Sequence, residues 1–480
     1  MNKKEICHII IMGDSLSDRG TADKATILGC IPMSWLAGLE GNSPKGRFAN
    51  GYVWADVISS MFASKFMISQ FKRKYKFGDD DIADAIIHHD KRVTEIIERS
   101  YTLDDDRYVT FDGRPFIRSY DEGGLSAYDY AWKPSTSITR FFSRIILSTL
   151  EDKRKLVLDY DEKKQVSAIQ KAHTLVIEWS GANDLITVNA KPSKAEVDRA
   201  IKERVKNVEI LIKNGYRNFI WINLPDLSLT PRYQNQTGKK GDDERANAHT
   251  CSNYFNSELD RACQRFKTLY PQCSFDVYDI NATFIDAYHH PEKYELDPNK
   301  LKKAFIDSPD FKMLPNDTAP SNGYAFWDDV HPTADVHTVL GTRFYNEYNP
   351  RYDFVAPKPE NAKEASIKLK EADLCNAFRS CYAEKLVKEQ HSFFGAHHHK
   401  FRHEYANANL QQILKDALYE KGTLSREVLT ELQWIDSSGE AKINIPVLHD
   451  ALKLLHASQN TQAANDEDYI IVSKDDIASL

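Results

Sequence analysis

Three short motifs in this 480-residue chain place a serine, an asparagine and an Asp–His pair where acyl-group chemistry could use them. Ser15 lies in the run Gly13–Asp18, directly after an apolar segment, and Asn183 follows a second apolar segment. Asp328 and His331 are three residues apart, so one local turn can hold the carboxylate against the imidazole. The other ring nitrogen is then free to accept a proton from a serine hydroxyl.

Each motif also has an ordinary structural explanation. A serine after a strand can cap a helix, an asparagine can close a strand through an Asx-turn, and an Asp-x-x-His pair can lie on a surface. In combination, however, they supply a nucleophile, an oxyanion donor and an acid–base pair, which serine ester hydrolysis requires.

The elements that must position these residues are predicted from apolar runs, which indicate strands buried on both faces. These runs are Ile6–Met12, Thr174–Trp179 and Asn218–Asn223. Between the last two, Ser193–Asn214 has apolar residues at helical spacing, and Gly215 follows as a helix stop. Strand, helix and strand in this order predict a parallel crossover, hence an α/β sheet with helices on its faces. Ligands bind such sheets at the carboxyl ends of the strands, where Ser15 and Asn183 are expected.

The motifs resemble those of the GDSL (SGNH) esterase/lipase family, specifically its bacterial phospholipase A/lysophospholipase and glycerophospholipid acyltransferase branch. Further matches are Gly46–Trp54, which reads Gly-Arg-Phe-Ala-Asn-Gly-Tyr-Val-Trp, and Asn223–Leu227 followed by Thr230-Pro231. The resemblance covers about residues 6–348. It implies a three-layer, flavodoxin-like α/β domain with a parallel sheet.

The resemblance also implies roles for individual residues. Ser15 would be the nucleophile, His331 the general base, and Asp328 the residue that orients the imidazole. The family's Asp-x-x-His spacing selects Asp328 over the adjacent Asp329. The Ser15 backbone N–H and the Asn183 side chain would form the oxyanion hole. Neither a metal nor a cofactor is implied.

One departure from the branch concerns a third oxyanion donor. The branch supplies a glycine N–H from the pattern Asn-Tyr-Ala-x-Gly-Gly-Ala, which we match with Asp129–Ser135. In simple register Pro134 replaces the donating glycine, and proline has no N–H. We therefore expect this donor to come from Lys133 or Ser135, or to be missing, at a cost of ~10²–10³ in rate.

The predicted activity is hydrolysis of lipid acyl esters through an acyl-enzyme on Ser15, with acyl transfer to an alcohol as an extension. Phospholipid or lysophospholipid esters are the expected substrates. Hydrolysis of carbohydrate or short-chain acetyl esters is an alternative. A non-catalytic scaffold with a decayed hydrolase domain is a second alternative.

The predicted hydrolase domain spans residues 1–350 and carries a charge-dense insertion at 72–121, which would act as a lid if it covered Ser15. Within the insertion we expect a helix over 79–99 and a hairpin over 108–116. A mainly helical C-terminal domain is expected at 356–460, as a candidate site for a protein partner, followed by a loosely held acidic tail at 461–480.

The charge balance and the hydropathy of the chain limit the classes of binding partner and the cellular locations that we expect. The chain has 63 Lys+Arg against 70 Asp+Glu, which gives no support to nucleic-acid binding. No apolar run is long enough for a transmembrane helix, and the apolar N-terminal stretch lacks the features of a signal peptide. We expect a cytoplasmic protein, or an effector exported without a conventional signal peptide. The run Lys72–Phe77 is a candidate for peripheral contact with anionic lipid, although a solvated loop is favoured because acidic residues follow it.

Overall fold

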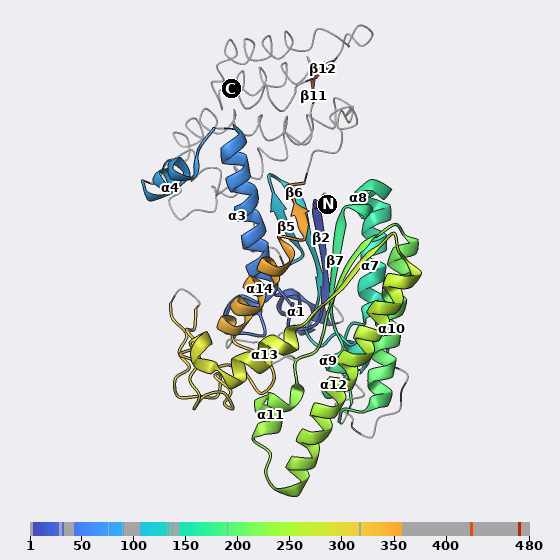
Figure 1. Ribbon diagram of the computed structural model, residues 1–480, viewed down its shortest axis with the longest axis vertical. Coiled ribbons are helices and arrows are strands. Elements are labelled where there is room, and N and C mark those ends of the chain that lie inside the picture. Colours follow the sequence, from blue (N-terminus) through green and yellow to red (C-terminus); the bar gives the residue numbers. More distant parts are fainter. Residues whose placement is uncertain are drawn as a thin grey trace. The chain divides into compact units, whose positions relative to one another are not determined.

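The computed structural model describes residues 3–27, 31–32, 43–74, 76–88, 90, 106–131, 133, 137, 144–189, 191–315, 318–357, 423–425 and 469–471. The chain divides into two compact units, Met1–Pro357 and Lys358–Leu480. All the residues of the predicted site lie in the first unit, which is shown in Figure 1.

A six-stranded sheet forms the centre of the first unit, with strand order β5-β6-β2-β7-β8-β9. Its strands are β5 (Tyr108–Phe111), β6 (Arg114–Asp121), β2 (His8–Gly13), β7 (Thr174–Trp179), β8 (Asn218–Ile222) and β9 (Ser274–Tyr278). All neighbours pair in parallel except β5 and β6, which form an antiparallel hairpin. The strands predicted at Thr174–Trp179 and Asn218–Asn223 are confirmed as β7 and β8, and β7 has the predicted bounds. The strand predicted at Ile6–Met12 is β2, but it begins at His8, because Ile6 belongs to β1 (Lys4–Ile6) in a separate two-stranded sheet.

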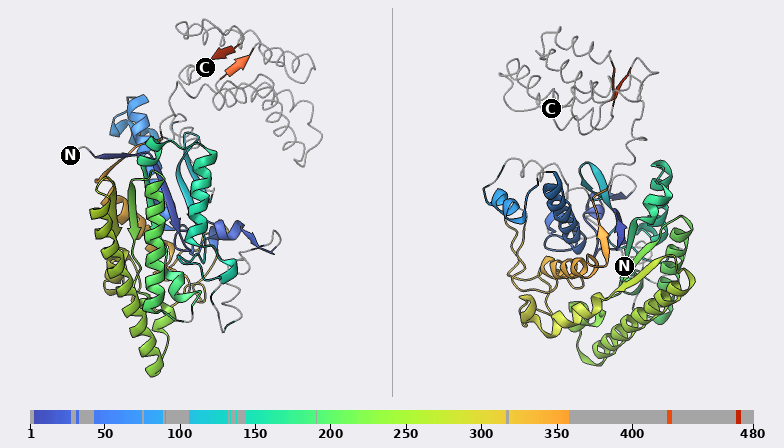
Figure 2. Two further views of the ribbon diagram at one scale, coloured as in Figure 1. Left: turned by 90° about the vertical axis from the view of Figure 1, so that its right-hand side faces the viewer. Right: turned by 45° about the horizontal axis from the view of Figure 1, so that its top comes forward.

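Helices cover both faces of this sheet (Figure 1). One layer contains α3 (Trp54–Lys74) and α14 (Ala334–Tyr348), and the other contains α7 (Leu150–Lys163), α10 (Lys194–Lys213) and α12 (Gly238–Leu269). Figure 2 shows α10 and α12 side by side on their face. The expected crossover helix is confirmed, because the Ser193 side chain caps α10 by accepting from the Glu196 N–H, and Gly215 follows with φ +105°.

The chain order of the strands fixes where a ligand can bind. From β2 the chain crosses through α3 to β6 on one side, and from β6 it crosses through α7 to β7 on the other side of β2. The carboxyl end of β2 is therefore a switch point of the sheet, which is where open α/β sheets bind ligands. The register aligns Gly13 with both Asp121 and Trp179, so the ends of β6, β2 and β7 are level.

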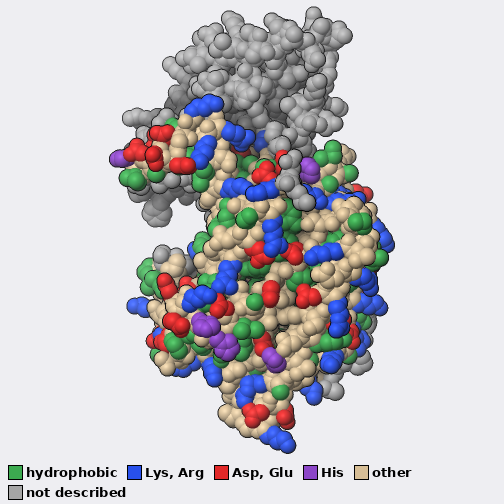
Figure 3. Space-filling model, viewed as in Figure 1, with side chains coloured by type: hydrophobic (Ala, Val, Ile, Leu, Met, Phe, Trp, Pro, Cys, Tyr) green, Lys and Arg blue, Asp and Glu red, His purple; other side chains and the backbone are tan. Residues whose placement is uncertain are grey.

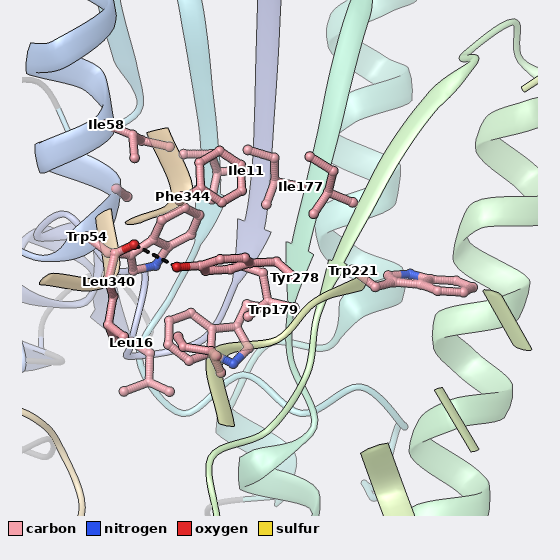
Figure 4. Close-up of a cluster of buried hydrophobic side chains, with 14 of the residues drawn as sticks. Ile11, Leu16, Trp54, Ile58, Ile177, Trp179, Trp221, Tyr278, Leu340 and Phe344 are labelled. Carbon is pink, nitrogen blue, oxygen red and sulfur yellow. Dashed lines mark hydrogen bonds between the residues drawn. The ribbon is translucent and has the colours of Figure 1, made fainter. Parts of the chain in front are cut away.

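Aromatic side chains pack between the sheet and the α3/α14 layer (Figure 4). The Trp54 ring lies 5.9 Å from Trp179 and 5.6 Å from Phe344, and the Tyr278 hydroxyl donates to the Leu340 carbonyl at 3.0 Å. Burial of each such side chain contributes about 1.5–3 kcal/mol. This packing fixes both helices against the strand ends that carry the candidate site.

The segment predicted as an insertion is partly a component of the sheet. The expected hairpin is confirmed, with Asp112 and Gly113 both at positive φ in its turn. Its second strand, β6, pairs with β2 over Ile9–Gly13. The hairpin that ends at Asp121 is therefore part of the central sheet and not an element added to it. The expected helix begins at Asp79 as α4 but ends at Ile87 instead of Arg99.

The lid hypothesis receives no support from α4. Figure 1 shows α4 beside the carboxyl end of α3, at the end of the sheet where β2 begins. Because α3 is 21 residues long, it separates α4 from the site by roughly 30 Å at 1.5 Å per residue. Residues 91–105 lie outside the described residues. The basic run begins within α3, where Lys72 pairs with Asp79 at 2.6 Å, rather than in a loop.

The second unit is described at only two places. β11 (Thr423–Ser425) and β12 (Tyr469–Ile471) pair in an antiparallel fashion. β11 lies within the range expected to be mainly helical, and β12 lies within the tail expected to be loosely held; both expectations stay predictions. Apart from β11, residues 358–460 of the domain expected to be mainly helical lie outside the described residues.

Candidate active site

The first candidate residue, Ser15, lies in a tight turn after β2. The turn needs a glycine at position 13, because a Cβ there would lie 2.7 Å from the Ser17 Oγ. Ser15 itself is 5% exposed. The Trp54 Nε1 donates to the Ser17 hydroxyl at 3.1 Å, which fixes the turn against α3.

The backbone of this turn has one unused donor. The Asp14 N–H donates to the Trp179 carbonyl, the Leu16 N–H to the Asp14 carboxylate, and the Ser17 N–H to the Asp14 carbonyl. Among the contacts of the described residues, the Ser15 N–H has no acceptor. A buried N–H without an acceptor is costly, and it is what an oxyanion hole requires before substrate binds.

The acid–base pair is held in one local turn before α14. The Ser15 hydroxyl donates to the His331 Nε2 at 2.7 Å, and the His331 Nδ1 contacts the Asp328 Oδ2 at 2.6 Å. The other carboxylate oxygen of Asp328 accepts the backbone N–H groups of Val330 and His331, at 2.8 and 2.7 Å. The structure therefore brings Ser15, His331 and Asp328 into one hydrogen-bonded chain.

The electrostatics of this chain favour a charged carboxylate and a basic imidazole. Burial alone would raise the pKa of Asp328, but His331 and the two backbone donors outweigh it and lower this pKa. Burial alone would lower the pKa of His331, but the charge of Asp328 outweighs it and raises this pKa above its ordinary value. Asp14 and Asp18 are fully buried, and burial raises their pKa values to about 7 and about 6.

The neighbouring Asp329 is engaged elsewhere. The Arg232 guanidinium donates to its two carboxylate oxygens, at 2.6 and 3.1 Å. The Asp329 carboxylate is therefore bound by Arg232, and the carboxylate that contacts the His331 ring is that of Asp328.

The candidate oxyanion side chain, Asn183, lies at the start of α9 (Ala182–Ile186), directly after β7. Gly181 precedes it with φ +117°, in a position where a Cβ would lie 2.6 Å from the Phe255 ring. The Asn183 Nδ2 donates to the Leu125 carbonyl at 3.0 Å, and its Oδ1 accepts from the Thr187 hydroxyl at 2.5 Å. These bonds fix the amide, and its second N–H has no acceptor among the residues that the structure describes.

A glycine pair that the sequence reasoning missed follows β6. Gly123 and Gly124 lie beside the end of β2, since the Glu122 N–H donates to the Gly13 carbonyl at 3.1 Å. The Gly123 N–H donates to Asp18 at 2.7 Å. The Gly124 N–H has no acceptor among the described residues, and Gly124 has φ +83°.

The strand end beside β2 therefore carries Gly123-Gly124, and not the Asp129–Ser135 stretch that we matched with the glycine pattern. Pro134 and Ser135 lie outside the described residues. The Lys133 N–H, the other donor expected there, donates to the Tyr130 carbonyl at 2.9 Å and is therefore not the expected oxyanion donor. The feature that could have revealed the pair is a Gly-Gly step directly after a predicted hairpin strand.

The Gly46–Trp54 motif contacts the turn that carries His331. The Phe48 ring lies 5.1 Å from the His331 ring. The Asn50 side chain accepts the Ala334 N–H at 2.7 Å and donates to the Ala319 carbonyl at 2.7 Å, which ties down the segment that follows His331. These contacts were not predicted from the sequence.

Within the part of the chain that is described, no group of three or more His, Cys, Asp or Glu residues is arranged to hold a metal ion. No described helix is both long and apolar enough to cross a membrane. Figure 3 shows acidic and basic side chains interspersed over one face of the first unit.

With this geometry established, comparison with known proteins gives the family. Residues 9–344 match the family described as GDSL-like Lipase/Acylhydrolase. The chain belongs to this family. The fold expected from the resemblance is confirmed for the first unit, and family membership implies an esterase- or lipase-type hydrolase.

Individual relatives of this GDSL chain are distant. The secreted effector protein SseJ of Salmonella typhimurium is 28% identical over 36% of this chain and 40% of its own length. The phosphatidylcholine-sterol acyltransferase of Aeromonas hydrophila is 21% identical over 72% of this chain and 92% of its own length. The GDSL esterase/lipase EXL2 of Arabidopsis thaliana is 21% identical over 71% of this chain and 87% of its own length.

Proposed function

We propose that this chain is a serine hydrolase of lipid acyl esters that works through an acyl-enzyme on Ser15. The observation that carries the proposal is the hydrogen-bonded chain from the Ser15 hydroxyl through His331 to Asp328. These three hydrogen-bonded side chains provide a nucleophile, a general base that accepts its proton, and a carboxylate that keeps the base in the required tautomer.

In the first half of the reaction, the Ser15 Oγ attacks the ester carbonyl and its proton passes to the His331 Nε2. The negative charge of the tetrahedral intermediate develops on the carbonyl oxygen. We assign its stabilisation to the N–H groups of Ser15 and Gly124 and to the Asn183 Nδ2. Each such donor is typically worth about 3 kcal/mol in the transition state.

Collapse of this intermediate breaks the ester C–O bond, and the leaving alcohol takes the proton from His331. An acyl group remains on Ser15. Water then attacks the acyl-enzyme while His331 accepts its proton, and collapse returns that proton to Ser15 as the acid is released. An alcohol in place of water would give acyl transfer, which is relevant because one relative is named an acyltransferase.

The test compares wild type with S15A on p-nitrophenyl esters from two to sixteen acyl carbons, and on lysophosphatidylcholine with release of free fatty acid as the readout. We expect hydrolysis that is lost in S15A and is faster for long chains. A preference for acetyl esters would replace the lipid substrate by the short-chain alternative. Equal activity in wild type and S15A would refute the mechanism.

A further inference from the structure

Arg232 connects the two parts of the candidate site that lie after β7 and before α14. It lies in the short helix α11 (Pro231–Gln234). Its guanidinium binds both carboxylate oxygens of Asp329, and its backbone N–H donates to the Asp329 carbonyl at 2.9 Å. Its Nη1 donates to the Ile186 carbonyl at 3.2 Å, at the end of the helix that begins beside Asn183.

Asp329 is thus held by both its side chain and its backbone, through a single arginine. Because Asp329 directly follows Asp328, the contacts of Arg232 with Asp329 also restrain the backbone of Asp328, whose carboxylate contacts His331. The planar fork of a guanidinium can bind a carboxylate through two bonds and a carbonyl through a third, whereas a lysine ammonium cannot reproduce this geometry.

We propose that Arg232 is a positioning residue that keeps the Asp328–His331 turn in register with the Asn183 helix and neutralises Asp329 beside the catalytic base. The inference rests on the proposed ester hydrolysis. Arg232 acts through Asp329 and Ile186, and not through contact with Ser15 or His331.

Several charged groups act on His331. Asp328 and Asp329 lie on its own turn and Asp14 lies on the nucleophile turn, and all three favour the protonated imidazole. His337 approaches from α14, where burial lowers its pKa to about 3 and keeps it neutral. Arg232 is the cation that offsets Asp329.

The two partners therefore have opposite effects on the base. Loss of the guanidinium leaves the Asp329 charge uncompensated and stabilises the imidazolium, so the pKa of His331 rises. Loss of the Asp329 carboxylate leaves Arg232 uncompensated, so this pKa falls. Since His331 accepts the serine proton only when it is neutral, the acidic limb of kcat/KM must move with its pKa.

The experiment measures kcat and KM against pH for wild type, R232M, D329N and the R232M/D329N double variant, on the best ester substrate. For R232M we expect the midpoint of the acidic limb of kcat/KM to move up by about 0.5 pH unit. This is the effect expected when one partly exposed charge is removed within a Debye length of the titrating group. We expect kcat of R232M to fall roughly tenfold with little change in KM, because the reacting groups are misaligned. D329N should move the limb to lower pH, and the double variant should return it towards wild type.

Two further variants separate positioning from general stability. In R232K the acidic limb of kcat/KM should lie close to its wild-type pH, because lysine also carries a positive charge. Its kcat should stay as low as in R232M, because lysine lacks the planar guanidinium that binds both carboxylate oxygens. R351M removes an arginine that binds Asp276 and Glu347 away from the site, and should leave both readouts unchanged. If R232M lowers the melting temperature but matches R351M in pH profile and kcat, the proposal is wrong.

A titration that needs no turnover keeps this inference distinct from the proposed function. The His331 ring is followed by NMR in protein labelled at histidine, with H331Q used for assignment. If wild type hydrolyses no ester, the proposed function fails, and the titration still decides about Arg232. An R232M midpoint above that of wild type supports the inference, and an unchanged midpoint overturns it.

Discussion

Replacement of Asp328 by asparagine tests the central geometry most directly. In wild type the Asp328 Oδ2 lies 2.6 Å from the His331 Nδ1 and keeps the proton on that nitrogen. An amide nitrogen at the same place would instead donate, so the imidazole would adopt the tautomer with its proton on Nε2. That nitrogen could then no longer accept the Ser15 proton. The asparagine Oδ1 would still accept the Val330 and His331 N–H groups, so the turn should persist.

The expected loss follows from this change of tautomer. We expect kcat of D328N to fall by roughly 10⁴, as in triads whose orienting carboxylate is made neutral, which corresponds to about 5.4 kcal/mol in the barrier. D329N is the matched control, because it makes the same change one residue along the chain and should cost less than about tenfold.

The assay is steady-state hydrolysis of a p-nitrophenyl ester, with thermal unfolding to confirm that both variants are folded. Two results would refute the reasoning. One is a D328N variant that keeps more than a tenth of wild-type kcat. The other is a folded D329N variant that loses as much as D328N, which would make Asp329 the orienting residue.

Three further outcomes follow from the structure. N183A should lower kcat by about 10²–10³, with less effect on KM, because the Asn183 amide is assigned to the oxyanion. A rise in KM as large as the fall in kcat would indicate that the amide contacts the bound substrate instead. The acidic limb of kcat/KM should lie above pH 6.5, since the pKa of His331 is raised and the base works when neutral; a limb below pH 6 would contradict the paired imidazole. D121N should raise the melting temperature at pH 8 and change it little at about pH 3.5, below the ordinary pKa of an aspartate. Burial raises the pKa of Asp121 well above its usual range, and its carboxylate oxygens have no hydrogen-bond partner among the described residues, so wild type loses stability as pH rises through that pKa; a destabilised D121N at pH 8 would show that the charged form is favoured.

The sequence carried most of the information about the sheet, because its inner strands are buried on both faces. Uniform apolar runs such as Thr174–Trp179 leave few alternatives, and the polar residues that follow them must lie at the strand ends. The spacing of Asp328 and His331 lets one turn bring them together, and the resemblance to the family selected Asp328 over the adjacent Asp329.

What could not be predicted depends on contacts between distant parts of the chain. The β6 strand has two arginines, a proline and other polar residues and gives no uniform apolar run, so its place beside β2 was not evident. Gly124 became a candidate donor only through that pairing. Arg232 and Asp329 are 97 residues apart, and no local pattern links them.

The parallel pair of β1 (Lys4–Ile6) and β10 (Tyr352–Phe354) joins the two ends of the hydrolase unit, with Lys4 opposite Tyr352. Closing so long a loop is entropically unfavourable until the intervening chain has folded, so this pair should form late, after the sheet is assembled. During synthesis, the nucleophile turn would emerge more than three hundred residues before its histidine, and β10 would appear only slightly after that histidine. The Val355 amide, which donates to the Ile6 carbonyl at 3.0 Å, is therefore a local reporter of whether the whole unit has closed.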